Sequence, residues 1–160
     1  MNGWLSTLVV AALVVGVVIR RLTGEPLNAR DLLAPPVVLT GIGVWSVAKA
    51  ADGLTPTDYA WVVAGSALGF ALGAWRGSSV QVFERSGTAW QRYSGRTFLI
   101  ALCGFAVMAG FALVAVRTGM HAAARPVTLS IGVSFLGESV AVGLRGLASG
   151  LPFAAERARR

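Results

Sequence analysis

Cysteine and histidine are nearly missing from this sequence of 160 residues, which holds only Cys103 and His121. A single cysteine excludes a disulfide within the chain and a dithiol redox pair. A single histidine excludes a bis-histidine haem site or a histidine-rich metal centre built by one copy. Glycine-rich phosphate loops, nucleophile elbows, zinc-ligand spacings and internal repeats are also missing. We therefore expect no cofactor and no metal, and the sequence leans away from an enzyme.

Charged residues are scarce as well, at 13% of the chain against about 25% in a soluble domain. Hydrophobic residues make up 55%. The net charge is +7, but the basic residues lie in short clusters between apolar runs, as they do beside membrane spans. This placement argues against a nucleic-acid partner. We expect an all-α membrane protein, one integral domain over residues 1–160, whose surroundings are the lipid bilayer.

Five apolar runs are candidates for transmembrane helices. The first is short for a span, but no positive residue precedes it and Arg20 and Arg21 follow it. We therefore interpret it as a span rather than a cleaved signal peptide. Pro35 and Pro36 open the second run, in a first helical turn where a missing N–H costs little. The predicted spans are 4–19, 32–49, 59–75, 97–116 and 127–144.

Lysine and arginine are divided unevenly between the two sides that these spans define. Eleven of the 14 fall in the first loop, the third loop and the C-terminal tail. The other side carries three: Lys49, Arg117 and Arg125. Because basic residues accumulate in cytoplasmic loops, we predict an N-terminus outside and a C-terminus in the cytoplasm. Four tryptophans lie mostly near the span ends, and we predict that they anchor the helices at the membrane surface: Trp4, Trp45, Trp61 and Trp75.

The third loop, residues 77–96, is too polar to span, and its central part, residues 79–94, carries a Ser-Gly pair between two alternating stretches. With Ser86 and Gly87 as a two-residue turn, Phe83 would face Trp90 across the strands. We predict a short cytoplasmic β-hairpin here, and the alternative is a disordered charged loop. An isolated hairpin is marginal in water, so we expect it to rest on the membrane surface or on a second copy.

Glycines recur every four residues in the third span, at Gly65, Gly69 and Gly73, and so share one helix face. Small residues at this spacing let two helices approach closely in lipid. The face would serve either a homodimer or packing against another helix of the same chain, and we favour packing within the chain. Gly41 and Gly43 of the second span would then supply a facing groove.

Glu138 is an acidic residue inside the fifth apolar run, in the stretch SFLGESVAVGL. An ionised acid deep in lipid costs about 2.5–3.5 kcal/mol on insertion scales, so such residues face protein and are candidates for function. Ser134, Glu138 and Arg145 fall on one helix face, which we expect to point inward. Arg145 is about 10 Å along the axis from Glu138, too far for an ion pair. The expected partner is one of three arginines that end spans on the same side: Arg20, Arg21 and Arg76.

The isolated polar groups each have a functional and a structural interpretation. If Glu138 is functional, it relays a proton or a cation or contacts a polar ligand. If it is structural, it is a lock bonded to a neighbouring helix. Cys103, in the middle of a span, is predicted to be a small packing residue. His121 is predicted to be a solvated loop residue, and the alternative is a weak cation site that it would share with Asp52 and Asp58.

Three features of the sequence resemble one known family. They are the Pro-Pro pair in APPVVLTG, the third span GSALGFALG leading into a hairpin with an aromatic residue, and the acidic last span SFLGES. Over roughly residues 25–145 the chain resembles the CcdC-like family of small bacterial membrane proteins. The resemblance implies a multi-pass protein of the bacterial cytoplasmic membrane. The family name implies a link to cytochrome c maturation and its thiol chemistry, but dithiol exchange needs two thiols and this chain has only Cys103.

The sequence thus predicts a non-enzymatic accessory or scaffold protein that assembles as a homo-oligomer or with a membrane-protein partner. One alternative is a small proton- or cation-coupled carrier, which needs an open polar path to Glu138. Another is a membrane enzyme acting on a lipid-like substrate, which needs a second polar group beside Glu138 at a shared cavity.

Overall fold

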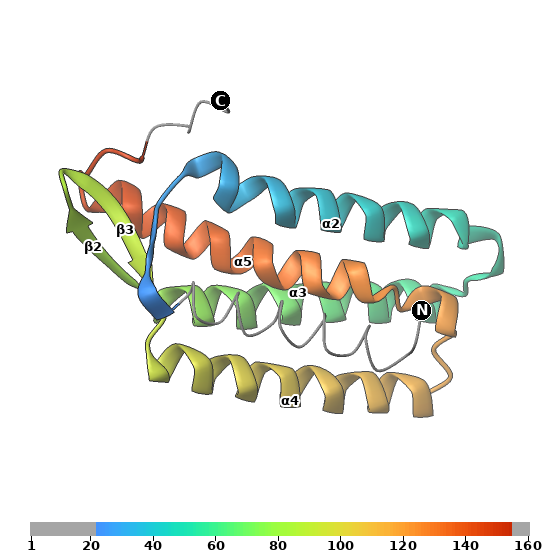
Figure 1. Ribbon diagram of the computed structural model, residues 1–160. Coiled ribbons are helices and arrows are strands. Elements are labelled where there is room, and N and C mark those ends of the chain that lie inside the picture. The colour runs from blue at the N-terminus through green and yellow to red at the C-terminus, as the bar shows by residue number, and fades with distance from the viewer. Residues whose placement is uncertain (1–21, 155–160) are drawn as a thin grey trace, which may run out of the picture.

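The computed structural model describes residues 22–154, so the predicted first span, 4–19, lies outside the described residues. Within that range four long helices run up and down beside one another (Figure 1). A small β-sheet closes one end of the bundle, which we call the sheet end, and the opposite end is the loop end. The helices are α2 (Ala29–Lys49), α3 (Pro56–Ser78), α4 (Gly95–Arg117) and α5 (Val127–Ala148), with the 3-10 turns η1 (Ala51–Gly53) and η2 (Ala122–Ala124) at the loop end.

Three segments of the described chain are long and apolar enough to cross a membrane: 29–49, 95–117 and 122–148. Helix α3 has 23 residues, the same number as α4, but it is less apolar because it carries more polar residues, among them Asp58, Ser66 and Ser78. The described part of the chain is therefore mainly helical, with three candidate membrane-spanning helices and a small antiparallel sheet.

Local sequence explains where the helices begin. Asn28 caps α2 by accepting a hydrogen bond from the backbone N–H of Arg30 at 2.9 Å. Capping boxes start α3, at Thr55 and Asp58, and α4, at Ser94 and Thr97. Because α2 already begins at Ala29, its Pro-Pro pair lies inside the helix and not in the first turn, and that prediction is wrong.

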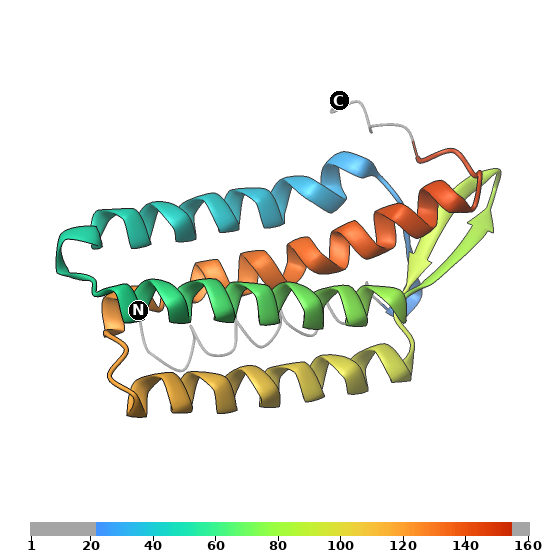
Figure 2. The ribbon, with the colours of Figure 1, turned by 180° about the vertical axis from the view of Figure 1, so that it is seen from behind.

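Helix α5 lies between α2 and α3, and α4 packs on α3 (Figures 1 and 2). The backbones approach closely because α5 carries a glycine toward each neighbour. A Cβ added at Gly132 would lie 2.5 Å from the backbone nitrogen of Thr40 in α2. A Cβ at Gly137 would collide with the carbonyl oxygen of Phe70 in α3. Close approach of small residues is the usual means by which helices pack in lipid.

The glycine face of α3 is used inside the chain, against α5. A Cβ at Gly73 would collide with the carbonyl oxygen of Ser134, and one at Gly69 would lie 3.9 Å from that of Ser130. Gly65 instead faces Phe111 of α4. The facing groove predicted from Gly41 and Gly43 is wrong, because Gly43 packs on Leu129 of α5 and Gly41 has nothing within 4 Å.

The predicted hairpin is present as β2 (Gln81–Arg85) and β3 (Thr88–Arg92), with Phe83 opposite Trp90 as expected. The φ angles of the two turn residues are 55° and 74°, in the left-handed region that such tight hairpin turns require. Sequence reasoning missed a third strand, β1 (Glu25–Pro26), which pairs with β3 and gives the order β1-β3-β2.

The hairpin rests on its own chain rather than only on a membrane surface or a second copy. A buried cluster at the sheet end joins the sheet to α5, and Leu151 and Phe153 of the C-terminal segment pack against it. The cluster consists of Leu27, Val80, Ala89, Tyr93 and Val142. The strand β1 and this cluster supply the support that an isolated hairpin would lack.

The outer faces of α2 and α4 carry exposed apolar side chains, among them Trp45 at 64% and Leu102 at 67%. Cys103 lies on this outer face of α4, so the prediction that it packs inside the protein is wrong. The interface-anchor prediction also fails for Trp61, which is partly buried and contacts Phe111 edge to face with ring centroids 5.1 Å apart.

Gly73→Ala is expected to weaken the packing of α3 on α5, because its methyl group meets backbone that cannot move aside. We expect a loss of about 1–3 kcal/mol, as for other overpacked contacts, measured as a lower melting temperature of the detergent-solubilised protein. Gly41→Ala is the matched control, because it fills open space and gains about 1 kcal/mol of helix propensity. Equal melting temperatures for the two variants would contradict the close approach at Gly73.

Candidate functional site

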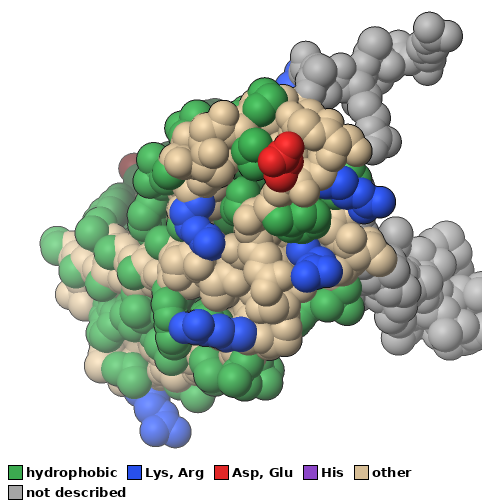
Figure 3. All heavy atoms as spheres, turned by 90° about the vertical axis from the view of Figure 1, so that its left-hand side faces the viewer, with side chains coloured by type: hydrophobic (Ala, Val, Ile, Leu, Met, Phe, Trp, Pro, Cys, Tyr) green, Lys and Arg blue, Asp and Glu red, His purple; other side chains and the backbone are tan. Residues whose placement is uncertain are grey.

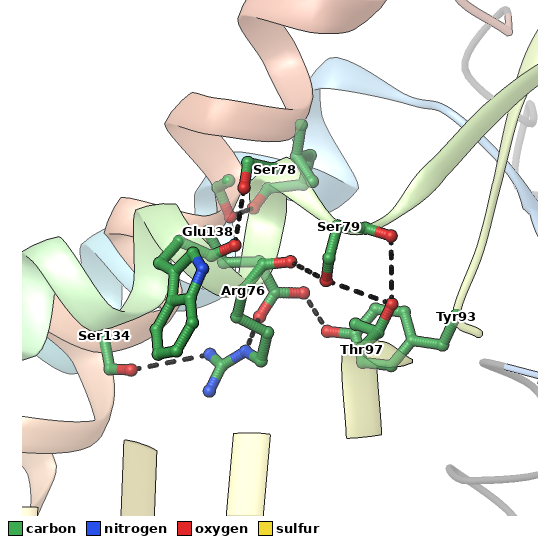
Figure 4. Close-up of polar contacts among 10 residues, drawn as sticks. Arg76, Ser78, Ser79, Tyr93, Thr97, Ser134 and Glu138 are labelled. Carbon is green, nitrogen blue, oxygen red and sulfur yellow. Dashed lines mark hydrogen bonds and ion pairs between the residues drawn. The ribbon is translucent and has the colours of Figure 1, made fainter. Parts of the chain in front are cut away.

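Glu138 is buried at the sheet end, with 3% of its surface exposed, and two other elements hold its carboxylate (Figure 4). Arg76, near the end of α3, donates from Nε to one carboxylate oxygen at 2.7 Å. Tyr93, just after β3, donates its hydroxyl to the other oxygen. The inward direction predicted for Glu138 is confirmed, and the ion-pair partner is one of the three arginines that the sequence suggested.

Arg76 is itself buried, with 8% of its surface exposed. Its guanidinium lies over the ring of Phe135 at 5.2 Å and reaches the hydroxyl of Ser134 at 3.5 Å. Two charges removed from water are tolerated when they pair with good geometry and when further hydrogen bonds satisfy their remaining polar atoms. The tyrosine hydroxyl, the serine hydroxyl and the aromatic face supply these additional contacts.

Arg145 serves a different partner, the C-terminal end of α3. Its guanidinium donates to the carbonyl oxygen of Ser78 at 2.7 Å and also to those of Gly77 and Val80. The last carbonyls of a helix have no partner within the helix, so an arginine from a neighbouring helix satisfies them. The predicted inward face of α5 therefore does contact α3, through Ser134, Glu138 and Arg145.

Ser139, the residue after Glu138, was missed by sequence reasoning, although the sequence carries a signal for it. Proline at position 36 has no N–H to give to the carbonyl of Leu32, four residues earlier in α2. The hydroxyl of Ser139 donates to this carbonyl at 2.8 Å. A proline inside an apolar helix thus predicts that some neighbouring side chain must supply the missing donor.

A second polar cluster joins two loops at the loop end. Asp58 accepts from the backbone N–H of Thr55 and from that of His121, and its carboxylate also lies 2.8 Å from the Nδ1 atom of His121. These hydrogen bonds, led by the N–H of Thr55, hold the pKa of Asp58 well below its ordinary value of 3.8. The carboxylate of Asp58 therefore remains ionised at neutral pH. Its hydrogen bonds fix the loop before α5 to the start of α3.

The cation site predicted as an alternative at this end is not formed by the described residues. Asp58 and His121 do meet, but they bond to each other, and within residues 22–154 no group of three acidic, histidine or cysteine side chains surrounds a shared point. His121 is also not simply a solvated loop residue, although its side chain is 54% exposed.

An apolar cleft of about 500 Å³ runs between α4 and α5, with α3 as its floor. Arg76 and Ser134 lie at its sheet end, whereas Glu138 is not among the residues that line it. The only acid of the predicted last span is therefore turned away from the cleft, behind Arg76. This arrangement separates the carboxylate from the cleft.

No family model matches this chain, and no curated protein or solved structure matches it either. The CcdC-like resemblance therefore stays a prediction from the sequence.

Removing one charge of the buried pair is expected to destabilise the fold, whereas removing both is expected to be nearly neutral. Glu138→Leu leaves the guanidinium of Arg76 buried without its carboxylate, at a cost of about 3–5 kcal/mol. The double variant Arg76→Leu with Glu138→Leu replaces the pair by apolar side chains and should recover most of that loss. Thermal unfolding in detergent measures both effects. If the double variant were as unstable as the single one, the pair would not be the reason for the loss.

Proposed function

We propose that this chain is a non-enzymatic accessory or scaffold protein of the bacterial cytoplasmic membrane, related to the CcdC-like family and built from five spans. The N-terminus lies outside and the sheet end lies in the cytoplasm. Its partners are the lipid bilayer and either a second copy or another membrane protein. Glu138 acts as a structural lock rather than as a relay.

One observation carries this proposal: the polar side chains in the C-terminal half of α5 are committed to holding other elements in place. Glu138 binds Arg76 and Tyr93, Ser139 binds the carbonyl of Leu32, and Arg145 binds the end of α3. A reacting or transporting group needs access to its substrate. Here the strongest candidate is 3% exposed and is engaged by two other elements.

The two alternative functions each have a specific weakness. A proton- or cation-coupled carrier needs an open polar path to Glu138, and the burial of its carboxylate behind Arg76 and Tyr93 disfavours one. An enzyme acting on a lipid-like substrate is favoured by the position of Arg76 and Ser134 at one end of the apolar cleft. However, Glu138, the only acid in the predicted last span, does not line that cleft and so cannot serve as its general acid or base.

The charge pattern supports the proposed orientation. Figure 3, which looks onto the sheet end, shows basic side chains, here all arginines, spread over this face. The helix ends and hairpin at the sheet end carry Arg30, Arg76, Arg85, Arg92, Arg96 and Arg145. The helix ends and the connecting segments at the loop end carry only Lys49, Arg117 and Arg125 among the described residues. An excess of basic residues on one side is the usual mark of the cytoplasmic side.

Cysteine labelling of spheroplasts tests this orientation. In a Cys103→Ala background, Ser86→Cys places the only thiol in the exposed hairpin turn, and Ala123→Cys places it in the exposed loop end. A membrane-impermeant maleimide is expected to label Ala123→Cys in intact spheroplasts and Ser86→Cys only after permeabilisation. The reverse pattern would place the sheet end outside and overturn the proposed orientation.

A strain that lacks the gene tests the structural role of the ion pair. The double variant Arg76→Leu with Glu138→Leu, expressed to the wild-type level, is expected to restore any phenotype of the deletion as fully as wild type does. This follows because neither charge takes part in chemistry or transport under the proposal. Failure of a well-folded, normally expressed double variant would contradict it.

A direct flux measurement on the same protein tests whether Glu138 takes part in transport. Proteoliposomes with wild-type protein are expected to show no more proton or cation flux than protein-free vesicles. A flux that disappears in Glu138→Gln, which keeps the shape of the side chain but cannot ionise, would establish the carrier instead.

A further inference from the structure

The apolar cleft between α4 and α5 lacks a helix to cover it within the described chain. It extends along the bundle from Arg76 and Ile100 at the sheet end to Met120 and Ala124 at the loop end. Helix α4 packs on α3 but not side by side with α5. Large apolar side chains at the rim of the cleft are therefore left exposed: Phe105 at 67%, Val127 at 70% and Ile131 at 40%.

The described chain begins near one end of this cleft. Gly24 lies against Gln91 and Arg92, a few residues before α4 begins at Gly95. The described chain therefore begins at the sheet end, close to the start of α4. The place where the described chain begins puts the preceding segment within reach of the cleft.

The composition and length of that segment suit the cleft. Residues 4–19 carry no charged side chain, so none of them would need an ionic partner in an apolar site. As a helix, sixteen residues would extend about 24 Å. The part of α4 from Ile100 to Ala115, whose ends line the cleft, has the same number of residues and so the same length. Small residues at Ala11, Ala12 and Gly16 allow close approach.

We propose that residues 4–19 form a helix that occupies this cleft, antiparallel to α4 and parallel to α3 and α5. The inference rests on the five-span part of the proposed function and adds to it the position of the first span. In this arrangement Ile19 lies level with Ile100, and residues 10–13 lie level with Met108. The first span then covers the cleft side of Arg76 and Ser134, and Arg20 and Arg21 join the basic sheet end.

Disulfide crosslinking in native membranes tests the proposal. In the Cys103→Ala background, single cysteines at four consecutive positions, Val10, Ala11, Ala12 and Leu13, cover one turn of the segment. Each is combined with Met108→Cys, which lines the cleft. A protease site in the exposed turn at Ser86 and Gly87 then separates the two cysteines onto different fragments, so that a crosslink keeps the fragments together on a non-reducing gel.

We expect at least one of the four positions to crosslink strongly to Met108→Cys, because one face of a helix in the cleft must point at α4. Two controls fix the geometry. Gly110→Cys is at nearly the same depth but does not line the cleft, and Ile100→Cys is displaced about 12 Å along α4. Both should crosslink several-fold less than Met108→Cys with the same segment position.

Three results would overturn the proposal. The first is no crosslink from any of the four positions to Met108→Cys, as expected if lipid fills the cleft. The second is equal crosslinking to Gly110→Cys. The third is a crosslinked product of twice the chain mass, which would place the segment of a second copy in the cleft. Crosslinking could fail while Ala123→Cys and Ser86→Cys are still labelled from the predicted sides of the membrane. The proposed orientation would then stand, and only the position of the first span would be wrong.

Discussion

The sheet end depends on one constraint, the need to neutralise a carboxylate that lies among apolar helices. Glu138 meets this constraint through Arg76 and Tyr93. The bond to Arg76 requires α3 and α5 to lie in one register, the register in which Gly77 meets the backbone of Glu138. The bond to Tyr93 brings in the residue that follows β3, so the position of the sheet relative to the bundle depends on the same carboxylate.

The other polar contacts of α5 follow the same logic. An apolar environment offers no water to backbone groups that lack a partner, so each such group must find a donor or acceptor within the protein. The carbonyl of Leu32, left without a donor by Pro36, and the last carbonyls of α3 receive theirs from Ser139 and Arg145. Polar side chains in this helix thus complete the hydrogen bonding of its neighbours α2 and α3.

Much of this arrangement can be predicted from the sequence, where the signal is local. Apolar runs predicted the four described helices, and the Ser-Gly turn fixed the register of β2 and β3. The helical spacing of Ser134, Glu138 and Arg145 predicted that the side chain of Glu138 points into the bundle. The strand β1 has only two residues, Glu25 and Pro26, too few for any periodic pattern. Tyr93 is distant in sequence from Glu138, and nothing near either residue indicates that they meet.

The central place of α5 also determines when this protein can assemble. Within the described chain, helices α2 and α3 have few contacts with each other, and both contact α5 extensively. The ribosome completes α5 last among the described helices, so α2, α3 and α4 are synthesised before the helix that joins them exists. Until then Arg76 has no carboxylate partner and the carbonyl of Leu32 has no donor. A nascent chain cut short before residue 127 would therefore hold helices without a bundle, a state that membrane proteases could distinguish from the finished protein by its unpaired polar groups.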